Sequence, residues 1–424
     1  MARLESPAID RLVELVRSEF AASHHDLAAT FEGCLRNSLD AMTPQPDGMT
    51  FLATGDIPAM WLRDASAQVA PYLALSAEDP QIHGLLRGLI RRMAMYVNID
   101  PYANAFNIGP NGRGHQSDRT AMTPWTWERK WELDSLCYPV RLIHDWWEVT
   151  RDASVFDEDL HRMLRLIVDT MRTEQQHASR SAYRFWRSEE AYPHDNLSHD
   201  GVGAPVVETG MVWVGFRPSD DACTYNFHVP SNMFAAEVLP ELAHLADEHF
   251  RDVDLARRAE AMAVEIRAGI EAHAVVDHPT AGRIYAYETD GLGNHLLIDD
   301  ANVPSLLSIP FLGYRQSNDP IYRATRDFVL STGNPYYFAG SAAAGIGSPH
   351  TPPRHVWPIS LAMQSLTTTD PDEARRLLDL LATTTAGSGL MHESFHVDDP
   401  SVFTRPWFGW ANSLFAEAVV ACLR

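Results

Sequence analysis

Apolar residues recur at helical spacing along most of the chain. In the stripes that begin at Leu133, Phe156 and Leu255, an apolar side chain returns every three or four positions, which is typical of an amphipathic helix with one buried face. The predicted helices follow one another in pairs, and longer segments connect the pairs. They are expected near residues 7–20, 24–42, 64–77, 80–98, 132–149, 153–176, 231–247, 250–273, 303–331 (two helices), 356–368, 371–384 and 410–422.

Local signals refine two of these helices. Pro139 lies within the stripe that begins at Leu133 and is expected to kink or interrupt that helix, because proline lacks a backbone N–H and clashes with the preceding turn. Asp370 is the expected N-cap of a second helix. Pro371 follows in its first turn and Glu373 stands three residues after the cap, which is a capping-box pattern.

Strand-like runs are confined to two stretches. Residues 181–217 and 277–300 contain them and predict short hairpins at one end of the helical body. The chain has no fixed repeat period that would indicate a short-repeat solenoid, and no low-complexity linker marks a domain boundary. We therefore predict an all-α protein in which residues 1–424 form a single domain of paired helices that close on themselves.

The charge of the chain narrows the class of partner. A formal net charge of -22 on 424 residues argues against nucleic acid or an anionic membrane, because phosphate binding needs clustered cations. A neutral ligand is more compatible with this negative charge. Lys130 is the only lysine, so arginine supplies nearly all of the positive charge. No stretch approaches the length of a membrane-spanning helix and the N-terminus lacks the pattern of a secretory signal, so the expected location is the cytoplasm.

Neither a metal site nor a disulfide framework is indicated. The cysteines have no paired spacing and are expected to be reduced and mostly packed. No zinc-type histidine motif and no complete dinucleotide-binding glycine motif occurs, so we expect neither a metal nor a cofactor. The nearest approach to a cation site is Asp299-Asp300 with Asn302. The four cysteines are Cys34, Cys137, Cys223 and Cys422.

Four segments combine acids, amides and aromatic residues at points where helix pairs are connected. A sugar site accounts for this combination, because planar polar groups hydrogen-bond to sugar hydroxyls and tryptophan packs on the C–H faces of the ring. Hydrolysis of a glycosidic bond also needs a carboxylic acid and a carboxylate on opposite faces of the sugar. The segments are residues 54–64, 125–134, 217–232, and 391–396 with 405–412.

Ordinary structural roles are the alternative for each of these residues taken singly. Tryptophan is often buried in a core, and aspartate often caps a helix. Such roles do not explain why four separate segments share the same mixture, since buried carboxylates need specific partners. We therefore interpret the four segments together as one functional site.

With four further blocks, the segments resemble glycoside hydrolase family 125, the exo-α-1,6-mannosidases. The blocks occur in the same order, and the resemblance extends from about residue 30 to the C-terminus. It implies an (α/α)6 toroid of six helix pairs and an inverting, metal-independent mechanism that removes non-reducing terminal α-1,6-linked mannose from an oligosaccharide. The further blocks are residues 299–305, 334–340, 345–350 and 355–359.

The resemblance also implies two catalytic carboxyl groups. The general acid is assigned to Asp220, with Asp221 as the competitor, because sequence alone cannot orient adjacent residues. The aspartate that is not the acid is expected to cap the helix that starts near Ser231 or to bind a sugar hydroxyl. The general base is Glu393, whose structural alternative is a salt bridge within a loop.

Other polar residues of the segments are candidates for substrate binding. Trp61, Arg63 and Asp64 are interpreted as holding the terminal mannose, and an internal Arg–Asp ion pair is the structural alternative. Glu132 and Asp134 are two residues apart, so on a continuous helix their side chains diverge and only one faces the site easily. The remaining candidates are Asp221, Asn226, His228, Asn302, His350 and Trp357.

Two rival functions use the same residues differently. Another (α/α)6 enzyme, such as a glucosidase or a sugar epimerase, would share the helical frame. An epimerase normally relies on histidine bases, however, and acidic pairs are more prominent here. A sugar-binding protein without turnover would not need both Asp220 and Glu393.

Overall fold

The computed structural model describes residues 5–21, 27–188 and 194–423, and helices make up most of its regular structure. The helices are α1 (Pro7–Glu19), α2 (Leu27–Asp40), α3 (Leu62–Val69), η1 (Ala70–Tyr72), α4 (Leu73–Ser76), α5 (Pro80–Ile99), α6 (Asp134–Thr150), η2 (Ala153–Val155), α7 (Glu158–Glu174), α8 (His177–Arg180), α9 (Ser198–Gly201), α10 (Val229–Phe250), α11 (Val253–His273), α12 (Ile309–Leu312), α13 (Pro320–Val329), α14 (Pro358–Thr367), α15 (Pro371–Thr383) and α16 (Gly409–Ala421).

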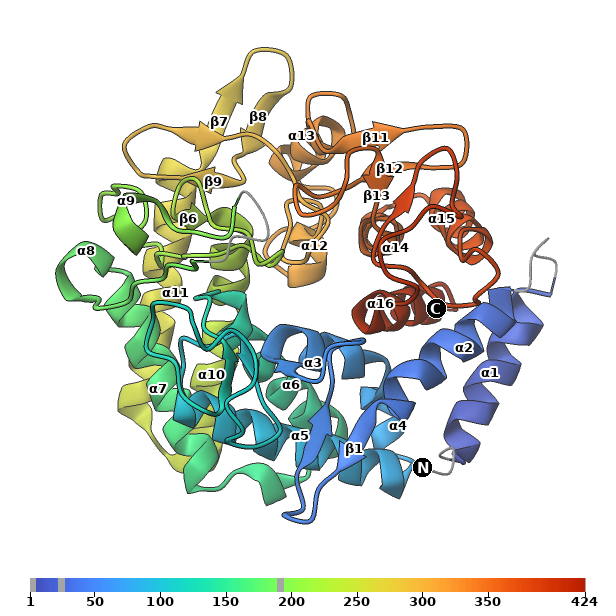
Figure 1. Ribbon diagram of the computed structural model, residues 1–424, viewed down its shortest axis with the longest axis horizontal. Coiled ribbons are helices and arrows are strands. Elements are labelled where there is room, and N and C mark those ends of the chain that lie inside the picture. The colour runs from blue at the N-terminus through green and yellow to red at the C-terminus, as the bar shows by residue number, and fades with distance from the viewer. Residues whose placement is uncertain (1–4, 22–26, 189–193, 424) are drawn as a thin grey trace.

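The helices are arranged around a common centre, and the chain passes around it once (Figure 1). α3, α6 and α16 lie toward the inside, whereas α1, α7 and α15 lie toward the outside. Helices that follow one another along the chain pack together, as α10 does with α11 and α14 with α15. α16 packs against α2 and α3, so the last helix meets the first part of the chain and closes the arrangement.

The predicted apolar stripes form the buried faces of these helices. In α7, Leu160, Met163 and Ile167 are buried, and the Asp157 carboxylate caps the helix by accepting a hydrogen bond from the Leu160 N–H. One continuous cluster of buried apolar residues extends from Ile9 to Val419. The same periodicity that predicted the helices therefore also predicted which faces they bury.

Short strands accompany the helices, so the protein is mostly helical rather than all-α. They form small sheets of two or three strands (Figure 1). The strands are β1 (Met42–Pro44), β2 (Thr50–Leu52), β3 (Met60–Trp61), β4 (Ala105–Phe106), β5 (Thr126–Glu128), β6 (Phe227–His228), β7 (Val275–His278), β8 (Gly282–Tyr285), β9 (Glu288–Thr289), β10 (His295–Leu296), β11 (Tyr337–Ala339), β12 (Ala344–Ile346), β13 (His355–Val356) and β14 (Phe395–His396).

One of the two hairpin predictions is confirmed. β7 and β8 form an antiparallel hairpin at the start of the stretch 277–300, and β9 pairs with β10 within it. The described part of 181–217 contains no named strand, so the prediction there is wrong. Its extended run from 211 to 216 satisfies its backbone with separate partners, since the Trp213 N–H donates to the Glu174 carbonyl and the Phe216 N–H to the Trp131 carbonyl.

The expectations for the N-cap of α15, for its capping box and for Pro139 in α6 have different outcomes. The Asp370 carboxylate accepts the Asp372 N–H and caps α15 as predicted. Glu373 does not complete a capping box, because its carboxylate bonds to Thr368, Gln364 and Arg326 instead. Pro139 was expected to kink or interrupt its helix; α6 runs through it, so the helix is not interrupted there.

The segments that link the helices place their polar residues at one set of helix ends. Trp61 precedes α3, His228 precedes α10 and Trp357 precedes α14. Phe408 stands in the same position before α16. Three of the four polar segments, together with the further block 355–359, therefore meet at the N-terminal ends of these helices.

Two further observations complete the description. None of the helices in the described ranges is long and apolar enough to cross a membrane. All four cysteines are free, and Cys34, Cys137 and Cys223 are buried as expected.

Candidate active site

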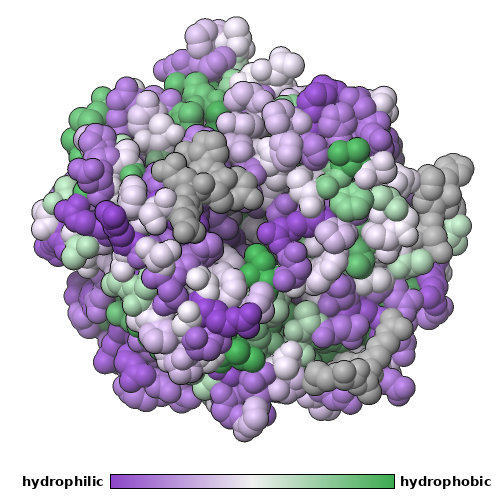
Figure 2. All heavy atoms as spheres, viewed as in Figure 1, coloured by the Kyte–Doolittle hydropathy of each residue, from purple (hydrophilic) through white to green (hydrophobic). Residues whose placement is uncertain are grey.

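A pocket of about 500 Å³ opens where the polar segments meet. The space-filling view shows a hollow near the centre of one face of the molecule, with mostly hydrophilic residues around it (Figure 2). The pocket is lined by Thr54, Ile57, Trp61, Arg63, Asp64, Pro218, Ser219, Asp220, Asn302, His350, Trp357, Glu393, Arg405, Phe408 and Trp410.

The first wall comes from the beginning of α3. β3 pairs with β4, and the Leu62 N–H donates to the Asn104 carbonyl, which fixes the start of the helix. Arg63 and Asp64 then lie in its first turn beside Trp61. All three side chains line the pocket.

Arg63 is surrounded by four carboxyl groups although only 3% of its side chain is exposed. Its nearest partners are Glu132 at 2.6 Å and Asp134 at 3.2 Å. Asp64 lies 3.5 Å and Asp220 lies 3.6 Å from other guanidinium nitrogens. The predicted alternative of an internal ion pair is therefore present as well, and Arg63 both lines the pocket and neutralises the acids around it.

Glu132 and Asp134 converge, which corrects the expectation that they diverge. α6 begins at Asp134, so Glu132 lies before the helix and is not bound by its geometry. Both side chains reach the same Nη1 atom of Arg63 and both are fully buried. Neither lines the pocket directly; each acts on it through Arg63.

Asp220 faces the pocket from the loop before α10. Its side chain is 28% exposed, and Asn104 Nδ2 donates to its Oδ1 over 3.3 Å. Its backbone is left-handed, with φ of 67°, a conformation that non-glycine residues adopt rarely. The Lys130 ammonium donates to its backbone carbonyl over 2.7 Å.

Asp220 and Glu132 form a coupled pair of carboxyl groups joined by a hydrogen bond. Burial, and then the negative charge of Asp220, raise the pKa of Glu132 well above its usual value. Burial alone would raise the pKa of Asp220 too, but the hydrogen bond from Glu132 and the cations Arg63 and Lys130 outweigh it and lower that pKa. In this arrangement the pair holds its proton on the Glu132 side.

Asp221 takes a different direction from its neighbour. Its side chain is only 3% exposed, and its Oδ1 lies 3.2 Å from His350 Nδ1. It does not cap α10, because His228 Nδ1 accepts the Ser231 N–H at that helix start. Of the two adjacent aspartates, Asp220 is the one that lines the pocket.

His350 stands between these acids and the opposite wall. Burial alone would lower its pKa. The carboxylates of Asp221, Asp220 and Glu393 outweigh burial and raise the pKa of His350 to about 9. The imidazole is therefore a cation at neutral pH.

Glu393 faces the pocket from the C-terminal part of the chain. β14 pairs with β13, which brings Glu393 close to the segment that carries Trp357. Its side chain is 12% exposed, and Arg405 Nε donates to its Oε1 over 3.1 Å. Arg405 also pairs with Asp56 at the pocket entrance. The predicted loop salt bridge therefore exists, and it holds a carboxylate that also lines the pocket.

Two predicted binding residues do not line the pocket. Asn226 is fully buried and joins two backbone segments, through the Ala204 N–H and the Val214 carbonyl. His228 is fully buried and caps α10. Both lie in the segment 217–232, and their hydrogen bonds to backbone groups hold the chain around the site.

Asn302 and Trp357 do line the pocket, whereas the acids near Asn302 serve the loop around them. The Asp299 carboxylate accepts the N–H groups of Leu306 and Leu307. Asp300 accepts the Asn302 side-chain amide. No group of acids, histidines and cysteines that could hold a metal ion occurs in the described ranges.

The sequence interpretation missed several polar residues of the site. Asn104 contacts three carboxylates, those of Glu128, Glu132 and Asp220. Lys130 and Arg405 lie within or beside predicted segments but were given no role. The signal that could have identified Lys130 is its occurrence as the only lysine of the chain.

Unpaired polar atoms show which chemistry the pocket can take. Trp61 Nε1 and Ser219 Oγ line it, are buried, and have no hydrogen-bond partner among the described residues. Buried polar groups are nearly always hydrogen-bonded. A ligand rich in hydroxyl groups would supply the missing hydrogen-bond partners of these two atoms.

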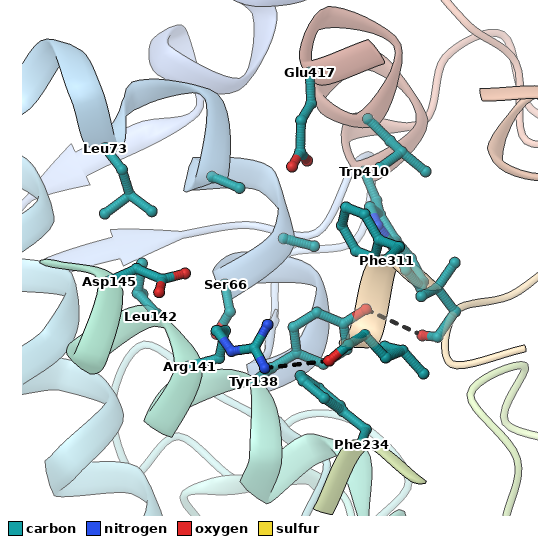
Figure 3. Close-up of a pocket in the computed structure, with 15 residues that line it drawn as sticks. Ser66, Leu73, Tyr138, Arg141, Leu142, Asp145, Phe234, Phe311, Trp410 and Glu417 are labelled. Atoms are coloured by element: carbon teal, nitrogen blue, oxygen red, sulfur yellow. Dashed lines mark hydrogen bonds between the residues drawn. The ribbon is translucent and has the colours of Figure 1, made fainter. Parts of the chain in front are cut away.

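A second cavity shares Trp410 with the pocket and is lined mainly by the inner helices (Figure 3). Its volume is about 790 Å³ when the part open to solvent is included. Asp145 of α6 and Glu417 of α16 approach it, and burial, with the nearby Asp145, raises the pKa of Glu417 to about 7. Its other walls are largely apolar, and it lacks the guanidinium-centred acid network beside Asp220, so we place the chemistry in the smaller pocket.

Two carboxyl groups on separate walls, a cationic imidazole and several tryptophans together define a glycoside hydrolase built on a helical frame. The family model of the metal-independent α-mannosidases, glycoside hydrolase family 125, matches residues 24–420. The chain belongs to this family.

Known relatives agree with this membership. A Schizosaccharomyces pombe protein, the meiotically up-regulated gene 157 protein, is 40% identical over 447 residues, which cover 99% of this chain and 86% of the relative. A solved structure of a metal-independent α-mannosidase from Streptococcus pneumoniae, in a non-productive complex with α-1,6-mannobiose, is 43% identical. It covers 99% of both chains with a TM-score of 0.95.

More distant structures share only the fold. A bacterial glucoamylase complexed with acarbose has a TM-score of 0.60 at 12% identity, over 93% of this chain and 55% of that chain. A wild-type glycosidase has a TM-score of 0.54 at 13% identity, over 99% of both chains. These likenesses support a helical glycosidase frame.

Proposed function

We propose that the enzyme removes non-reducing terminal α-1,6-linked mannose from oligosaccharides with inversion at the anomeric carbon. The observation that carries this proposal is that Asp220 and Glu393 approach one pocket from different segments. Membership of the α-mannosidase family gives the sugar. The α-1,6-mannobiose bound by the Streptococcus pneumoniae relative supports the linkage.

In the proposed mechanism Asp220 is the general acid and Glu393 the general base. Glu393 takes a proton from a water molecule, which attacks the anomeric carbon while Asp220 protonates the departing oxygen. A single displacement of this kind gives β-mannose first. The mechanism needs room for the water, so the two carboxyl groups should face each other across about 6.5–9.5 Å when the sugar is bound.

The pair of Glu132 and Asp220 gives a source for the acid proton. A sugar that fills the pocket excludes water from the Asp220 carboxyl, which is the more exposed of the two, and desolvation raises the pKa of a carboxyl group. The shared proton then moves from Glu132 to Asp220, from which it reaches the leaving group. Glu132 acts through Asp220 in this scheme and does not touch the substrate.

The remaining pocket residues are proposed to hold the terminal mannose. Arg63, Asp64 and His350 supply charged hydrogen-bond partners for its hydroxyls. Trp61 and Trp357 supply ring faces, Trp61 also supplies its unpaired indole N–H, and Asn302 supplies an amide. Asp134 and Asp221 fix Arg63 and His350 through the contacts described above.

We also propose that residues 1–424 form one catalytic domain with the (α/α)6 toroid arrangement of six helix pairs. The large buried cluster that extends from Ile9 to Val419 and the packing of α16 against α2 and α3 support it. The likeness to the helical glycosidases points the same way.

Leaving-group dependence tests the two catalytic roles. Asp220→Ala should reduce turnover of α-1,6-mannobiose by about 10²–10⁴-fold but retain much of the activity on α-mannosyl fluoride, whose leaving group needs little protonation. Glu393→Ala removes the activation of water and should therefore lower the activity on both substrates to a similar degree. Proton NMR of the first-formed sugar reports the stereochemistry.

Asp221→Ala is the matched control, because this carboxylate is adjacent in sequence but bonded to His350. If it, rather than Asp220→Ala, shows the selective loss on mannobiose, the acid is Asp221. Binding of mannobiose without turnover by the wild-type protein would instead identify a sugar-binding protein. First-formed α-mannose would refute inversion.

A further inference from the structure

Lys130 occupies an unusual place for the only lysine of the chain. It lies between β5 and α6, and only 3% of its side chain is exposed. Thirty-three arginines supply the other positive side chains, since lysine and arginine together number 34. The side chain at this position therefore ends in a compact ammonium group, whereas the arginine side chains end in a planar guanidinium.

The ammonium group of Lys130 has three oxygen partners. Nζ donates to the Asp220 backbone carbonyl over 2.7 Å and to the Asp195 carboxylate over 2.9 Å. A Glu128 oxygen lies 3.8 Å away. The backbone of Lys130 is also fixed, because its N–H donates to the Asn104 side-chain oxygen over 3.1 Å. The donor is therefore rigidly held beside the loop that carries Asp220.

That loop needs such support. Asp220 has a left-handed backbone with φ of 67°, although it is not glycine. The chain neighbours of Asp220 use the same local turn, since the Asp220 N–H donates to the Arg217 carbonyl and the Arg217 N–H donates to the Asp221 carbonyl. The Asp220 carbonyl itself is bonded by Lys130. Rotation of this peptide unit would break that bond and turn the Asp220 side chain away from the pocket.

The other partners of Lys130 show that its charge is already balanced without Asp220. Asp195 and Glu128 are both buried carboxylates, and Arg187 pairs with each of them. A purely structural ion pair would therefore be satisfied by these acids alone. The contact to the Asp220 carbonyl is additional, and it links the ion-pair cluster to the proposed acid.

We propose that Lys130 is a positioning residue, which holds the Asp220 backbone in its left-handed conformation so that the carboxyl group faces the leaving oxygen. The proposal rests on the assignment of Asp220 as the general acid. Lys130 does not touch the sugar in this role. Its removal should therefore weaken protonation of the leaving group more than binding of the terminal mannose.

Two substitutions separate the geometry from the charge. Lys130→Met keeps the length of the side chain and removes the ammonium. Lys130→Arg keeps the charge that neutralises Asp195 and Glu128, so it should fold, but a planar guanidinium cannot reproduce the three diverging donors. Both variants should lose about 10–100-fold in kcat on α-1,6-mannobiose, part of the 10²–10⁴-fold contribution of a positioned acid, while KM changes less than about threefold.

The same variants should keep activity on α-mannosyl fluoride within about threefold, because that substrate needs little help from the acid. If Lys130 had a purely structural role, its replacement would lower the activity on both substrates equally. That result in Lys130→Arg would overturn the proposal. Full activity of Lys130→Arg on both substrates would overturn it too. Asp195→Asn is the matched control, since it removes the charge of another partner of Lys130 and should leave the preference between substrates unchanged.

A measurement on the wild-type enzyme complements the variants. With isotope-labelled lysine the protein gives one lysine side-chain signal in NMR spectra. We expect a slowly exchanging ammonium that shifts when mannose saturates the pocket. A rapidly exchanging, solvent-like signal that mannose leaves unchanged would refute the contact to Asp220. If Asp220→Ala itself shows no dependence on the leaving group, the acid assignment fails instead, which distinguishes the two proposals.

Discussion

Replacement of Arg63 by methionine tests the electrostatic core of the site. Arg63 is almost completely buried and is the shared partner of Glu132, Asp134, Asp64 and Asp220. Methionine fills a similar space but leaves these acids without their common cation. Removal of one partner from a buried ion pair typically costs about 3–5 kcal/mol, because the remaining charge stays desolvated.

The expected change in melting temperature follows from the size of the chain. At about 2.1 cal/mol/K per residue, 424 residues have an unfolding entropy of about 0.9 kcal/mol/K near the transition. A loss of about 3–5 kcal/mol therefore lowers Tm by about 3–6 °C. Differential scanning calorimetry at pH 8 measures this shift directly.

The destabilisation caused by Arg63→Met should depend on pH, and the pKa of Asp64 gives the direction of this dependence. Burial, only partly offset by Arg63, already raises the pKa of Asp64 to about 6, and without Arg63 the pKa rises further. A carboxyl group with a raised pKa in the folded state favours folding at low pH and loses that contribution as pH rises through the folded pKa. The destabilisation of Arg63→Met should therefore be smaller at pH 5 than at pH 8.

Arg162→Met is the control for this experiment. Arg162 also forms an ion pair, with Asp159 at 2.6 Å, but the two side chains are 60% and 64% exposed. An exposed pair contributes about 0–1 kcal/mol, so Tm should change by no more than about 1 °C. If Arg63→Met melts like the wild type at pH 8, or becomes less stable as the pH falls, the acids are not held by this guanidinium.

Three further predictions concern other parts of the molecule. Because burial and Asp145 raise the pKa of Glu417 to about 7, its ionised form opposes folding at higher pH. Glu417→Gln should stabilise the protein by at most about 3 kcal/mol at pH 8 and little at pH 5; equal gains at both pH values would contradict this. Exhaustive chelation should leave mannosidase activity within about twofold, since carboxyl groups supply the catalytic charge, and loss restored by calcium would refute it. In a crystal structure with bound mannobiose, Asp220 and Glu393 should be separated by about 6.5–9.5 Å, whereas about 5 Å would favour retention.

The helices could be predicted from the sequence because each one is amphipathic over several turns. The stripe of α7 is an example, where the spacing of Leu160, Met163 and Ile167 alone identifies the buried face. Pro139 shows the limit of local rules. Its missing N–H costs α6 one hydrogen bond, but α6 packs against α3 and α10 along its length, and this packing outweighs the local loss.

The candidate site could be predicted as a set of segments more readily than as a set of contacts. Glu132 and Asp134 were expected to diverge, because helical geometry was applied to a residue that precedes the helix. Asn226 and His228 were expected to bind substrate, because polar residues within a functional segment look alike in sequence. Their hydrogen bonds to backbone groups determine their actual roles.

The interactions that tune the site are those between residues distant in sequence. Glu132 and Asp220 shift each other's pKa although they are 88 positions apart in the chain, so no local sequence pattern links them. Their coupling arises because the sheet of β3, β4 and β5 brings Asn104 and Lys130 beside the loop that carries Asp220. Sequence motifs can therefore suggest candidate catalytic carboxyl groups, but the pKa values of these groups depend on cations and amides that only the folded chain assembles. For this reason the sharpest tests of the proposed mechanism lie at Arg63, whose charge lowers the pKa of Asp220, and at Lys130, whose ammonium donates to the Asp220 carbonyl.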